Sequence, residues 1–278
     1  MNIINDFPWR TYTKEELMLE YNKLKKKLKK DKITFPIIYS RIGLKCSNYF
    51  FQYERLNTIS QQKQSCIDFW YKNKNKIIEY SKDNKRDYFS TIVFLNHAPS
   101  QFPIYCAGQI YKYFKVSKVL DFCAGWGDRC LAAIVLGIDY IGIDSNINLE
   151  KYYNNMINFY PINSKIKLIF DKAENVNFDL FEFDLIFTSP PFWNKKKYIL
   201  EQYYNCEIDY DNFLKNCLIP IILKYKNIKP VCLNIPEHMY NDILKYTGKC
   251  KEIFYFKTGT NHKNKNHSSQ EYNYIYYF

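Results

Sequence analysis

The sequence lacks long apolar runs, a leader-like start and paired cysteines. No stretch approaches the roughly 18 uninterrupted apolar residues of a membrane-spanning helix, so we expect a protein without a membrane span. The opening residues MNIINDFPWR do not place a basic segment before an apolar one, which indicates that the chain is not secreted. The nine cysteines are odd in number and never spaced CxxC. This favours reduced thiols in a cytoplasmic or other reducing intracellular compartment over a disulfide framework or a zinc site.

Arginine is scarce although the chain is basic. The 40 Lys and Arg residues, of which only five are Arg, exceed the 28 acidic residues and give a net charge of +12. Lys, Asn, Ile, Tyr and Phe are abundant, and all five are encoded by A/T-rich codons, so codon bias explains the charge without any function. A polyanionic partner explains it equally well, because positive charge attracts phosphate backbones whatever its origin.

The hydrophobic pattern changes near residue 95 and divides the 278 residues into a region 1–95 and a region 96–278. In the first region, Thr13 and Glu16 have the spacing of a capping box at the start of a basic helix. Residues 60–80 predict a second helix, and residues 35–56 between the two predict turns and loops. We therefore expect a helical, basic N-terminal region that is a candidate nucleic-acid or target-recognition module.

Strands and helices alternate after residue 95. Strands are predicted at 116–122, 139–144, 165–171, 183–192 and 230–235, with helices between them, and 251–257 with 271–278 predicts a closing hairpin. Repeated strand–helix units call for a parallel sheet with helices on both faces. The predicted fold class is α/β, a doubly wound, mostly parallel sheet with a C-terminal antiparallel hairpin and an N-terminal helical extension.

Ligands of such sheets bind beyond the carboxyl ends of the strands, so the loops there are candidate sites. In DFCAGWG, Gly125 and Gly127 let the backbone approach a ligand closely. A nicotinamide or flavin fingerprint would need a third glycine where the chain has Cys130. Asp144 ends the second strand, where its carboxylate can accept ribose hydroxyls, and Asp171 ends the third, where it can receive an adenine amino group. Either Asp, taken alone, equally suits a helix cap or a turn.

The loop after the fourth strand carries the rarest pattern, Ser189, Pro190, Pro191 and Phe192. The prolines stiffen the backbone, serine supplies an acceptor and phenylalanine a flat ring. With this pattern, residues from about 97 to 278 resemble the class I S-adenosylmethionine-dependent methyltransferases, which have a Rossmann-like fold. Within them the sequence resembles the amino-methyltransferases of nucleic acids, whose signature is Asn/Asp/Ser-Pro-Pro-Tyr/Phe/Trp. The Ser-Pro-Pro form is similar to cytosine-N4 enzymes, and GWGDR followed by YIGID resembles methyltransferases of phages and large DNA viruses.

The resemblance implies a cofactor site for S-adenosylmethionine. Its methionine and ribose part would lie against the first loop, its ribose hydroxyls on the carboxylate that ends the second strand, and its adenine against the third loop. Trp126 either covers the cofactor or packs on the following helix, and Arg129 in that helix suits an ion pair, a phosphate contact or the surface. The implied cofactor residues are Asp121, Ala124, Gly125, Gly127, Asp144, Asp171 and Ala173.

The resemblance also implies a target site. Ser189 and the Pro190 carbonyl would accept hydrogen bonds from an exocyclic amino group and aim its lone pair at the methyl group, without a metal. Phe192 would stack on a base flipped out of its helix, or else serve as a hydrophobic plug. The basic run that follows would contact the nucleic-acid backbone beside the target; it comprises Lys195, Lys196 and Lys197.

The sequence thus predicts methyl transfer from S-adenosylmethionine to the exocyclic amino nitrogen of a base in DNA, cytosine N4 or adenine N6. Two alternatives stay open. The first keeps the chemistry and moves it to RNA, because Pro-Pro-aromatic loops also serve enzymes acting on RNA. The second is a non-catalytic nucleic-acid-binding or stimulatory subunit with a methyltransferase fold.

Overall fold

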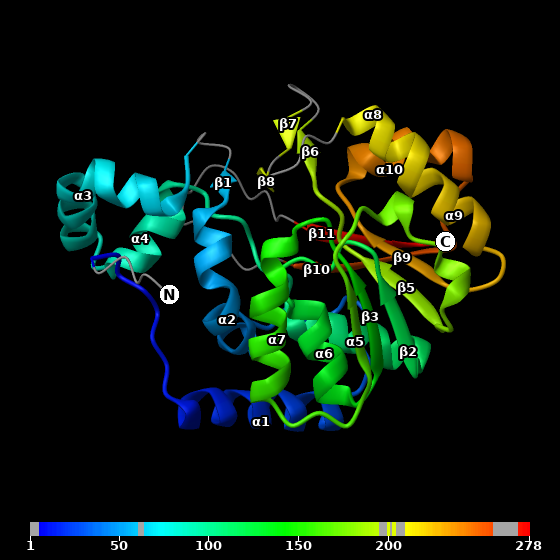
Figure 1. Ribbon diagram of the computed structural model, residues 1–278, viewed down its shortest axis with the longest axis horizontal. Coiled ribbons are helices and arrows are strands. Elements are labelled where there is room, and N and C mark those ends of the chain that lie inside the picture. The colour runs from blue at the N-terminus through cyan, green and yellow to red at the C-terminus, as the bar shows by residue number, and fades with distance from the viewer. Residues whose placement is uncertain (1–5, 61–63, 195–198, 201, 204–208, 258–271) are drawn as a thin grey trace.

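The computed structural model describes residues 6–60, 64–194, 199–200, 202–203, 209–257 and 272–278. At its centre is a seven-stranded sheet in the order β10-β11-β9-β5-β2-β3-β4 (Figure 1). Five neighbouring strands are parallel: β2 (Lys118–Asp121), β3 (Asp139–Ile143), β4 (Ile166–Ile169), β5 (Leu185–Thr188) and β9 (Val231–Asn234). The hairpin of β10 (Glu252–Lys257) and β11 (Tyr272–Tyr277) is joined to β9 through β11, antiparallel.

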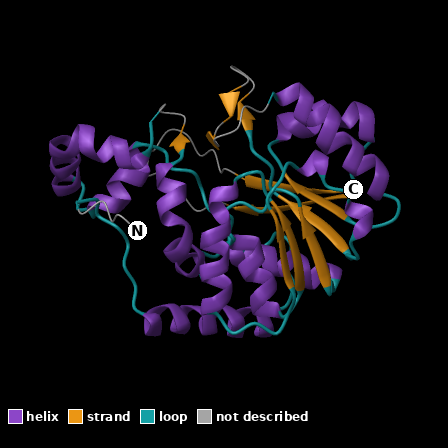
Figure 2. Cartoon of the chain, in the orientation of Figure 1, coloured by secondary structure: helices purple, strands orange, loops and turns teal. Residues whose placement is uncertain are grey.

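Helices cover both faces of the sheet (Figure 2). One face carries α5 (Ile104–Phe114), α6 (Asp128–Leu136) and α7 (Glu150–Phe159). The other carries α8 (Tyr210–Phe213), a π-helical turn (Leu214–Leu218), α9 (Ile219–Tyr225) and α10 (Glu237–Thr247). Because successive residues of a strand point to opposite faces, Val119 packs in the first layer and Leu120 in the second. The predicted fold class is confirmed.

The fourth strand is shorter than the sequence predicts. The expectation was 183–192, whereas β5 spans Leu185–Thr188 and ends directly before Ser189. The two prolines that follow explain the difference, because proline has no backbone N–H to donate to a neighbouring strand. The Ser-Pro-Pro-Phe segment therefore leaves the sheet as a loop at its carboxyl edge.

The N-terminal region contains α1 (Lys14–Lys30), α2 (Leu44–Asn57), α3 (Cys66–Asp83) and α4 (Tyr88–Leu95). The capping box of α1 is confirmed, since the Glu16 N–H donates to Thr13 Oγ1 at 3.2 Å and the Thr13 N–H donates to Glu16 Oε2 at 2.8 Å. The second predicted helix is also present, although it begins at Cys66 and not at residue 60.

Helix α2 contradicts the predicted loop over 35–56. Its buried face is unusually polar, so no apolar period of 3.6 marks it in the sequence. It also begins after Gly43 without a side-chain cap. The polar or charged residues on its buried face are Ser47, Asn48, Gln52, Glu54 and Arg55.

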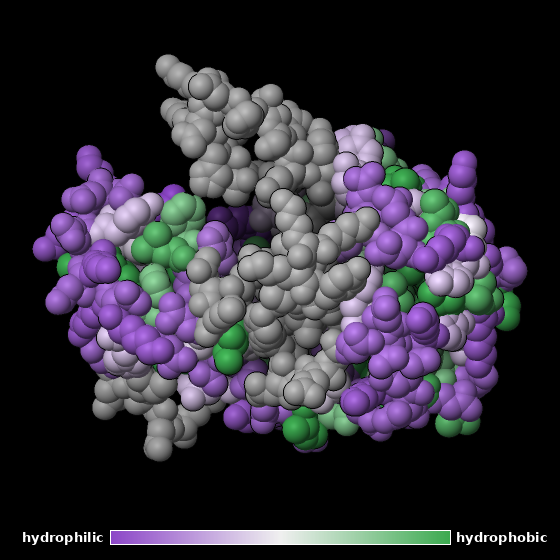
Figure 3. Space-filling model, turned by 90° about the horizontal axis from the view of Figure 1, so that it is seen from above, coloured by the Kyte–Doolittle hydropathy of each residue, from purple (hydrophilic) through white to green (hydrophobic). Residues whose placement is uncertain are grey.

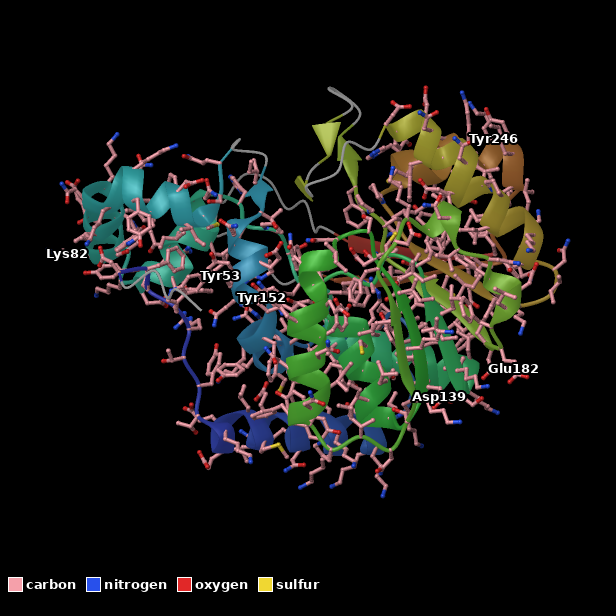
Figure 4. The ribbon with its side chains drawn as sticks, in the orientation of Figure 1. Tyr53, Lys82, Asp139, Tyr152, Glu182 and Tyr246 are labelled. Atoms are coloured by element: carbon pink, nitrogen blue, oxygen red, sulfur yellow. The ribbon has the colours of Figure 1, made fainter. Side chains whose placement is uncertain are left out.

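The N-terminal region consists of two parts that pack in different hydrophobic clusters. Helices α1 and α2 share one hydrophobic cluster with α5, α6 and α7, whereas α3 and α4 pack in a second cluster around Trp70 that also includes Phe7 and, at the end of α2, Leu56. In Figure 4, Tyr53 on α2 lies near Tyr152 on α7, whereas Lys82 lies far from both, on the α3–α4 lobe formed by those two helices. The first two helices therefore complete the core of the sheet-bearing part.

Two short pairings lie above the carboxyl ends of the strands (Figure 1). The strand β6 (Trp193–Asn194) pairs with β7 (Ile199–Leu200), and β1 (Ile59–Ser60) pairs antiparallel with β8 (Gln202–Tyr203). The second pairing ties the segment between α2 and α3 to the segment that follows the Ser-Pro-Pro-Phe loop. In the part of the chain that the structure describes, no helix is both long enough and apolar enough to span a bilayer.

Candidate active site

A cavity of about 460 Å³ lies where the carboxyl ends of the parallel strands meet. That volume is within the range of sites for small ligands, roughly 300–1,000 Å³. Seen from above, mainly hydrophilic surfaces of the α3–α4 lobe and of the α8–α10 side flank the middle of the molecule (Figure 3). The cavity walls come from the loops after β2, β3, β4 and β5, from the end of β9, from α8 with the π-helical turn, from β10, and from the segments before α2 and α5.

The glycine turn after β2 presents one open glycine and one enclosed glycine. Gly125 lines the cavity with φ +60°, and an added Cβ there would meet no heavy atom closer than 3.8 Å. Gly127 has φ +72°, and an added Cβ there would lie 2.6 Å from Cε2 of Phe51. Ala124 also lines the cavity. Gly125 thus exposes bare backbone to a ligand, while Gly127 lets α2 pack against the start of α6.

Asp121 lies beneath the cavity and is fully buried. Arg129 donates to it through Nε at 2.7 Å, Tyr140 through its hydroxyl at 2.7 Å and Thr188 through Oγ1 at 2.8 Å. Arg129 also donates from Nη2 to the Cys123 carbonyl, at 2.5 Å. Of the three roles open to Arg129, the structure shows the ion pair. The cluster joins the glycine turn to the last residue of β5, directly before Ser189.

Asp144 lines the cavity beside Gly125. Its Oδ2 accepts the Gly125 N–H at 2.7 Å and its Oδ1 accepts the Asn146 N–H at 3.0 Å. Burial raises the pKa of Asp144 above its ordinary range, against these two hydrogen bonds. A carboxylate has about four acceptor positions, so each oxygen can accept a further hydroxyl from a diol.

Part of the loop after β4 lines the cavity and part of it lies outside the lining. Ala173 lines the cavity together with Lys172 and Glu174. Asp171 is exposed, and its Oδ1 accepts the Lys172 N–H at 2.7 Å and the Asn175 amide at 2.8 Å. Of the seven predicted cofactor residues, Ala124, Gly125, Asp144 and Ala173 line the cavity, whereas Asp121, Gly127 and Asp171 do not. Cofactor contact stays a prediction for all seven.

All four residues of the predicted target loop line the same cavity: Ser189, Pro190, Pro191 and Phe192. Ser189 Oγ donates to Asn234 Oδ1 at 3.1 Å, and Asn234 Nδ2 donates to the Tyr274 carbonyl at 2.8 Å. The glycine turn and the Ser-Pro-Pro-Phe loop therefore face one common space. Their catalytic roles stay predictions, and Lys195, Lys196 and Lys197 lie outside the described residues.

Asp128 is a cavity residue that the sequence gives no reason to select. Its Oδ1 accepts the Ser47 hydroxyl at 2.5 Å and the Gln101 amide at 3.1 Å, and its Oδ2 accepts the Phe102 N–H at 2.9 Å. Burial raises its pKa to about 6, although these hydrogen bonds lower it. This carboxylate joins α2 and the segment before α5 to the first residue of α6.

An aromatic wall closes the side of the cavity beyond the serine loop. Tyr39 and Phe256 are stacked with ring centroids 6.3 Å apart, and Phe102 meets Phe256 edge to face at 6.0 Å. Trp126 also lines the cavity while being largely buried. These residues come from four distant segments, so only the fold brings them together.

Residues 116–266, just over half of the chain, match the family described as RNA cap guanine-N2 methyltransferase. Among solved structures, the human methyltransferase 10 domain containing protein aligns with TM-score 0.44 and 11% identity over 65% of this chain and 84% of its own. An rRNA methylase from Streptococcus thermophilus aligns with TM-score 0.41 and 12% identity over 65% and 98%. The tRNA (uracil-54, C5)-methyltransferase of Pyrococcus abyssi, in complex with S-adenosyl-L-homocysteine, aligns with TM-score 0.41 and 14% identity over 64% and 39%. No curated protein sequence matches the chain.

Proposed function

The chain belongs to the RNA cap guanine-N2 methyltransferase family and is an S-adenosylmethionine-dependent methyltransferase, and on that premise we propose that it methylates the exocyclic N2 amino group of a guanine at the 5′ end of RNA. The observation that carries the proposal is the cavity shared by the glycine turn and the Ser-Pro-Pro-Phe loop. The sequence alone favours DNA, whereas the family favours RNA. We therefore put RNA first and leave DNA as an outcome of the test.

The residues present fit the cofactor. S-adenosylmethionine supplies a methyl group on a sulfonium, which is already a strong electrophile. Asp144 would hold the ribose diol, and the open backbone of Gly125 would lie against the ribose and methionine part. Ala173 would bound the adenine. The bare backbone at Gly125, next to a carboxylate with acceptor positions to spare, is what an adenosine-bearing ligand needs.

The target loop suits an amino group attached to a ring. The nitrogen lone pair of such a group is conjugated with the base, so it is a poor nucleophile until hydrogen bonds to its protons draw it out of conjugation. Ser189 Oγ and the Pro190 carbonyl are the acceptors that this loop would offer to those protons. The nitrogen would then form an N–C bond to the methyl group as the C–S bond breaks, which leaves S-adenosyl-L-homocysteine, and would release a proton to solvent. Positioning of the lone pair is the main contribution of the protein.

A terminal guanine also removes a difficulty of the DNA hypothesis. A base inside a duplex must be flipped out of its stack before its amino group can reach a buried methyl group, and flipping costs a few kcal/mol. A base at the 5′ end of RNA has no partner on one side and can enter the cavity without that cost. Phe192 would stack on it, as aromatic side chains do on unpaired bases of RNA.

The proposal is tested by supplying methyl-labelled S-adenosylmethionine with three substrates of one sequence: 5′-capped RNA, the same RNA without a cap, and DNA. Nucleoside analysis should find the label on N2 of the cap guanine. Label on cytosine or adenine of DNA would replace the RNA proposal with the DNA one. If calorimetry detects no binding of S-adenosylmethionine, the cofactor site is wrong.

Ser189→Ala tests the target loop. We expect the rate of methyl transfer to fall about 10- to 100-fold, the effect of losing one hydrogen bond to the reacting group, with cofactor affinity unchanged. Ser117→Ala is the matched control, because Ser117 lies at the opposite, amino end of β2, where its hydroxyl bonds to Asp184. An unchanged rate in Ser189→Ala would remove the serine from the proposed site.

A further inference from the structure

Asn234 ends β9, the strand beside β5, and is almost wholly buried at 3% exposure while lining the cavity. A buried amide needs a partner for both its oxygen and its nitrogen. The structure supplies one for each: the Ser189 hydroxyl at 3.1 Å and the Tyr274 carbonyl at 2.8 Å. The orientation of this amide determines what Ser189 can do in the cavity.

The chemistry of the partners allows one orientation. The Tyr274 carbonyl can only accept, so the NH₂ group of Asn234 must face it. The amide oxygen must then face Ser189. Because that oxygen can only accept as well, the hydroxyl proton of Ser189 must point at Asn234.

We propose that Asn234 is a positioning residue that occupies the hydroxyl proton of Ser189, so that Ser189 Oγ meets the target amino group only as an acceptor. A hydroxyl group is both a donor and an acceptor, since it can donate one hydrogen bond and accept two. A serine free to rotate could donate its proton to the amino lone pair, which would occupy the electrons that must attack. With its proton held by Asn234, serine presents lone pairs alone, as the side-chain oxygen of an asparagine or aspartate does at that position.

The inference rests on the proposed function, because it assumes that the target of Ser189 is an amino group. Its test compares Asn234→Leu with Asn234→Asp. Leucine removes the acceptor for the serine proton. Aspartate keeps an oxygen acceptor for the serine proton, and when ionised it has, like leucine, no proton to donate to the Tyr274 carbonyl, so the comparison is made over a pH series that extends to the ionised form. If Asn234 only tethers β9 to β11, both variants should lower kcat. If Asn234 holds the serine proton, only Asn234→Leu should lower it.

We expect Asn234→Leu to lower kcat about tenfold, the effect of one misdirected hydrogen bond, and to leave the dissociation constant for S-adenosylmethionine unchanged. We expect Asn234→Asp to stay within about threefold of the natural chain, because the serine proton is still held. Equal losses in both variants, or no loss in Asn234→Leu, would overturn the inference. If Asn234→Leu does not fold, Asn234→Ala replaces it in the same comparison.

A double-variant cycle separates this inference from the proposed function. In a Ser189→Ala background there is no serine proton to hold, so adding Asn234→Leu should cost less than twofold in kcat. A full tenfold further loss would mean that Asn234 acts without Ser189 and would overturn the inference. If Ser189→Ala itself has no effect, the proposed function of the loop fails, whatever Asn234 does.

Discussion

At the scale of single residues, Asp128 lines the cavity, and its raised pKa of about 6 makes the stability of the fold depend on pH. The unfolded value is near 3.9, so between about pH 4 and 6 the native state binds more protons than the unfolded state. The contribution of this group to stability is therefore largest below that window and falls as the pH rises through it, by an amount on the order of 3 kcal/mol.

Asp128→Asn should remove that dependence. Urea unfolding at pH 4, 5, 6 and 7.5 should show that the difference in unfolding free energy between variant and natural chain changes across the window and is constant above it. Asp211→Asn, on the exposed start of α8, is the matched control and should show no such change. Parallel pH profiles for the natural chain and Asp128→Asn would contradict the assignment.

Arg129 and Asp121 form a buried ion pair, with side chains 5% and 0% exposed. Arg129→Met should lower the free energy of unfolding by about 3–5 kcal/mol, because it leaves Asp121 charged, buried and without its cation. Thermal unfolding measures the loss. Adding Asp121→Asn to Arg129→Met should restore part of it, since the uncompensated charge is then gone. A double variant less stable than Arg129→Met would contradict this account.

At the scale of elements, α2 packs against the glycine turn after β2. Gly127→Ala forces a Cβ toward the Phe51 ring and requires φ +72° of an alanine. We expect a loss of about 1–3 kcal/mol in stability and weaker binding of S-adenosylmethionine, because the neighbouring Gly125 moves with the turn. Phe51→Leu in the same chain should recover part of the stability by removing the contact while the backbone strain remains. Calorimetry and urea unfolding measure the two effects.

Gly137→Ala is the control for Gly127→Ala. Gly137 has φ +71°, nearly the same backbone strain, but an added Cβ would meet no atom within 4 Å. It should lose stability through strain alone and leave cofactor binding unchanged. Equal cofactor affinities in the two variants would show that the contact with Phe51 does not act on the cofactor site.

The elements also show how far sequence reasoning reaches. Apolar strands bounded by turns, such as Lys118–Asp121 and Val231–Asn234, were predictable because a buried parallel strand has a distinct composition. Helix α2 was not, because the polar groups of its buried face bond to distant segments: Arg55 donates to the Pro99 carbonyl at 2.8 Å. No local pattern records a partner 44 positions away.

The candidate site, too, could be predicted from the sequence only in part. Gly125, Asp144 and the Ser-Pro-Pro-Phe loop each follow a predicted strand, so the strand ends predicted that they face one cavity, and all of them line it. Asn234 also ends a predicted strand and could have been chosen on that ground. What could not be predicted is that β9 lies beside β5 and so brings Asn234 within hydrogen-bond distance of Ser189, because strand order is a property of the whole chain.

At the scale of the whole molecule, α1 lies on the side opposite the short strands β6, β7 and β8 (Figure 1). Tyr21 on α1 donates to the Pro161 carbonyl, in the connection that leads into β4, and α1 therefore lies at the amino ends of the strands. Lys25, Lys26 and Lys29 are exposed there. Replacing these three with Gln should leave the rate of methyl transfer to a short RNA within about twofold, because screening reduces charge effects beyond a Debye length of about 10 Å. A rate that falls several-fold would place RNA across α1.

The order of the last strands has a consequence for how the protein is made. β11 follows β10 in sequence, yet it lies between β10 and β9 in the sheet. A ribosome that has released every residue through β10 has delivered the glycine turn, the serine loop and Phe256, but β10 still has no place in the sheet. Because β11 joins β10 to the rest of the sheet, Phe256 can take its place in the cavity wall only after β11 has been synthesised.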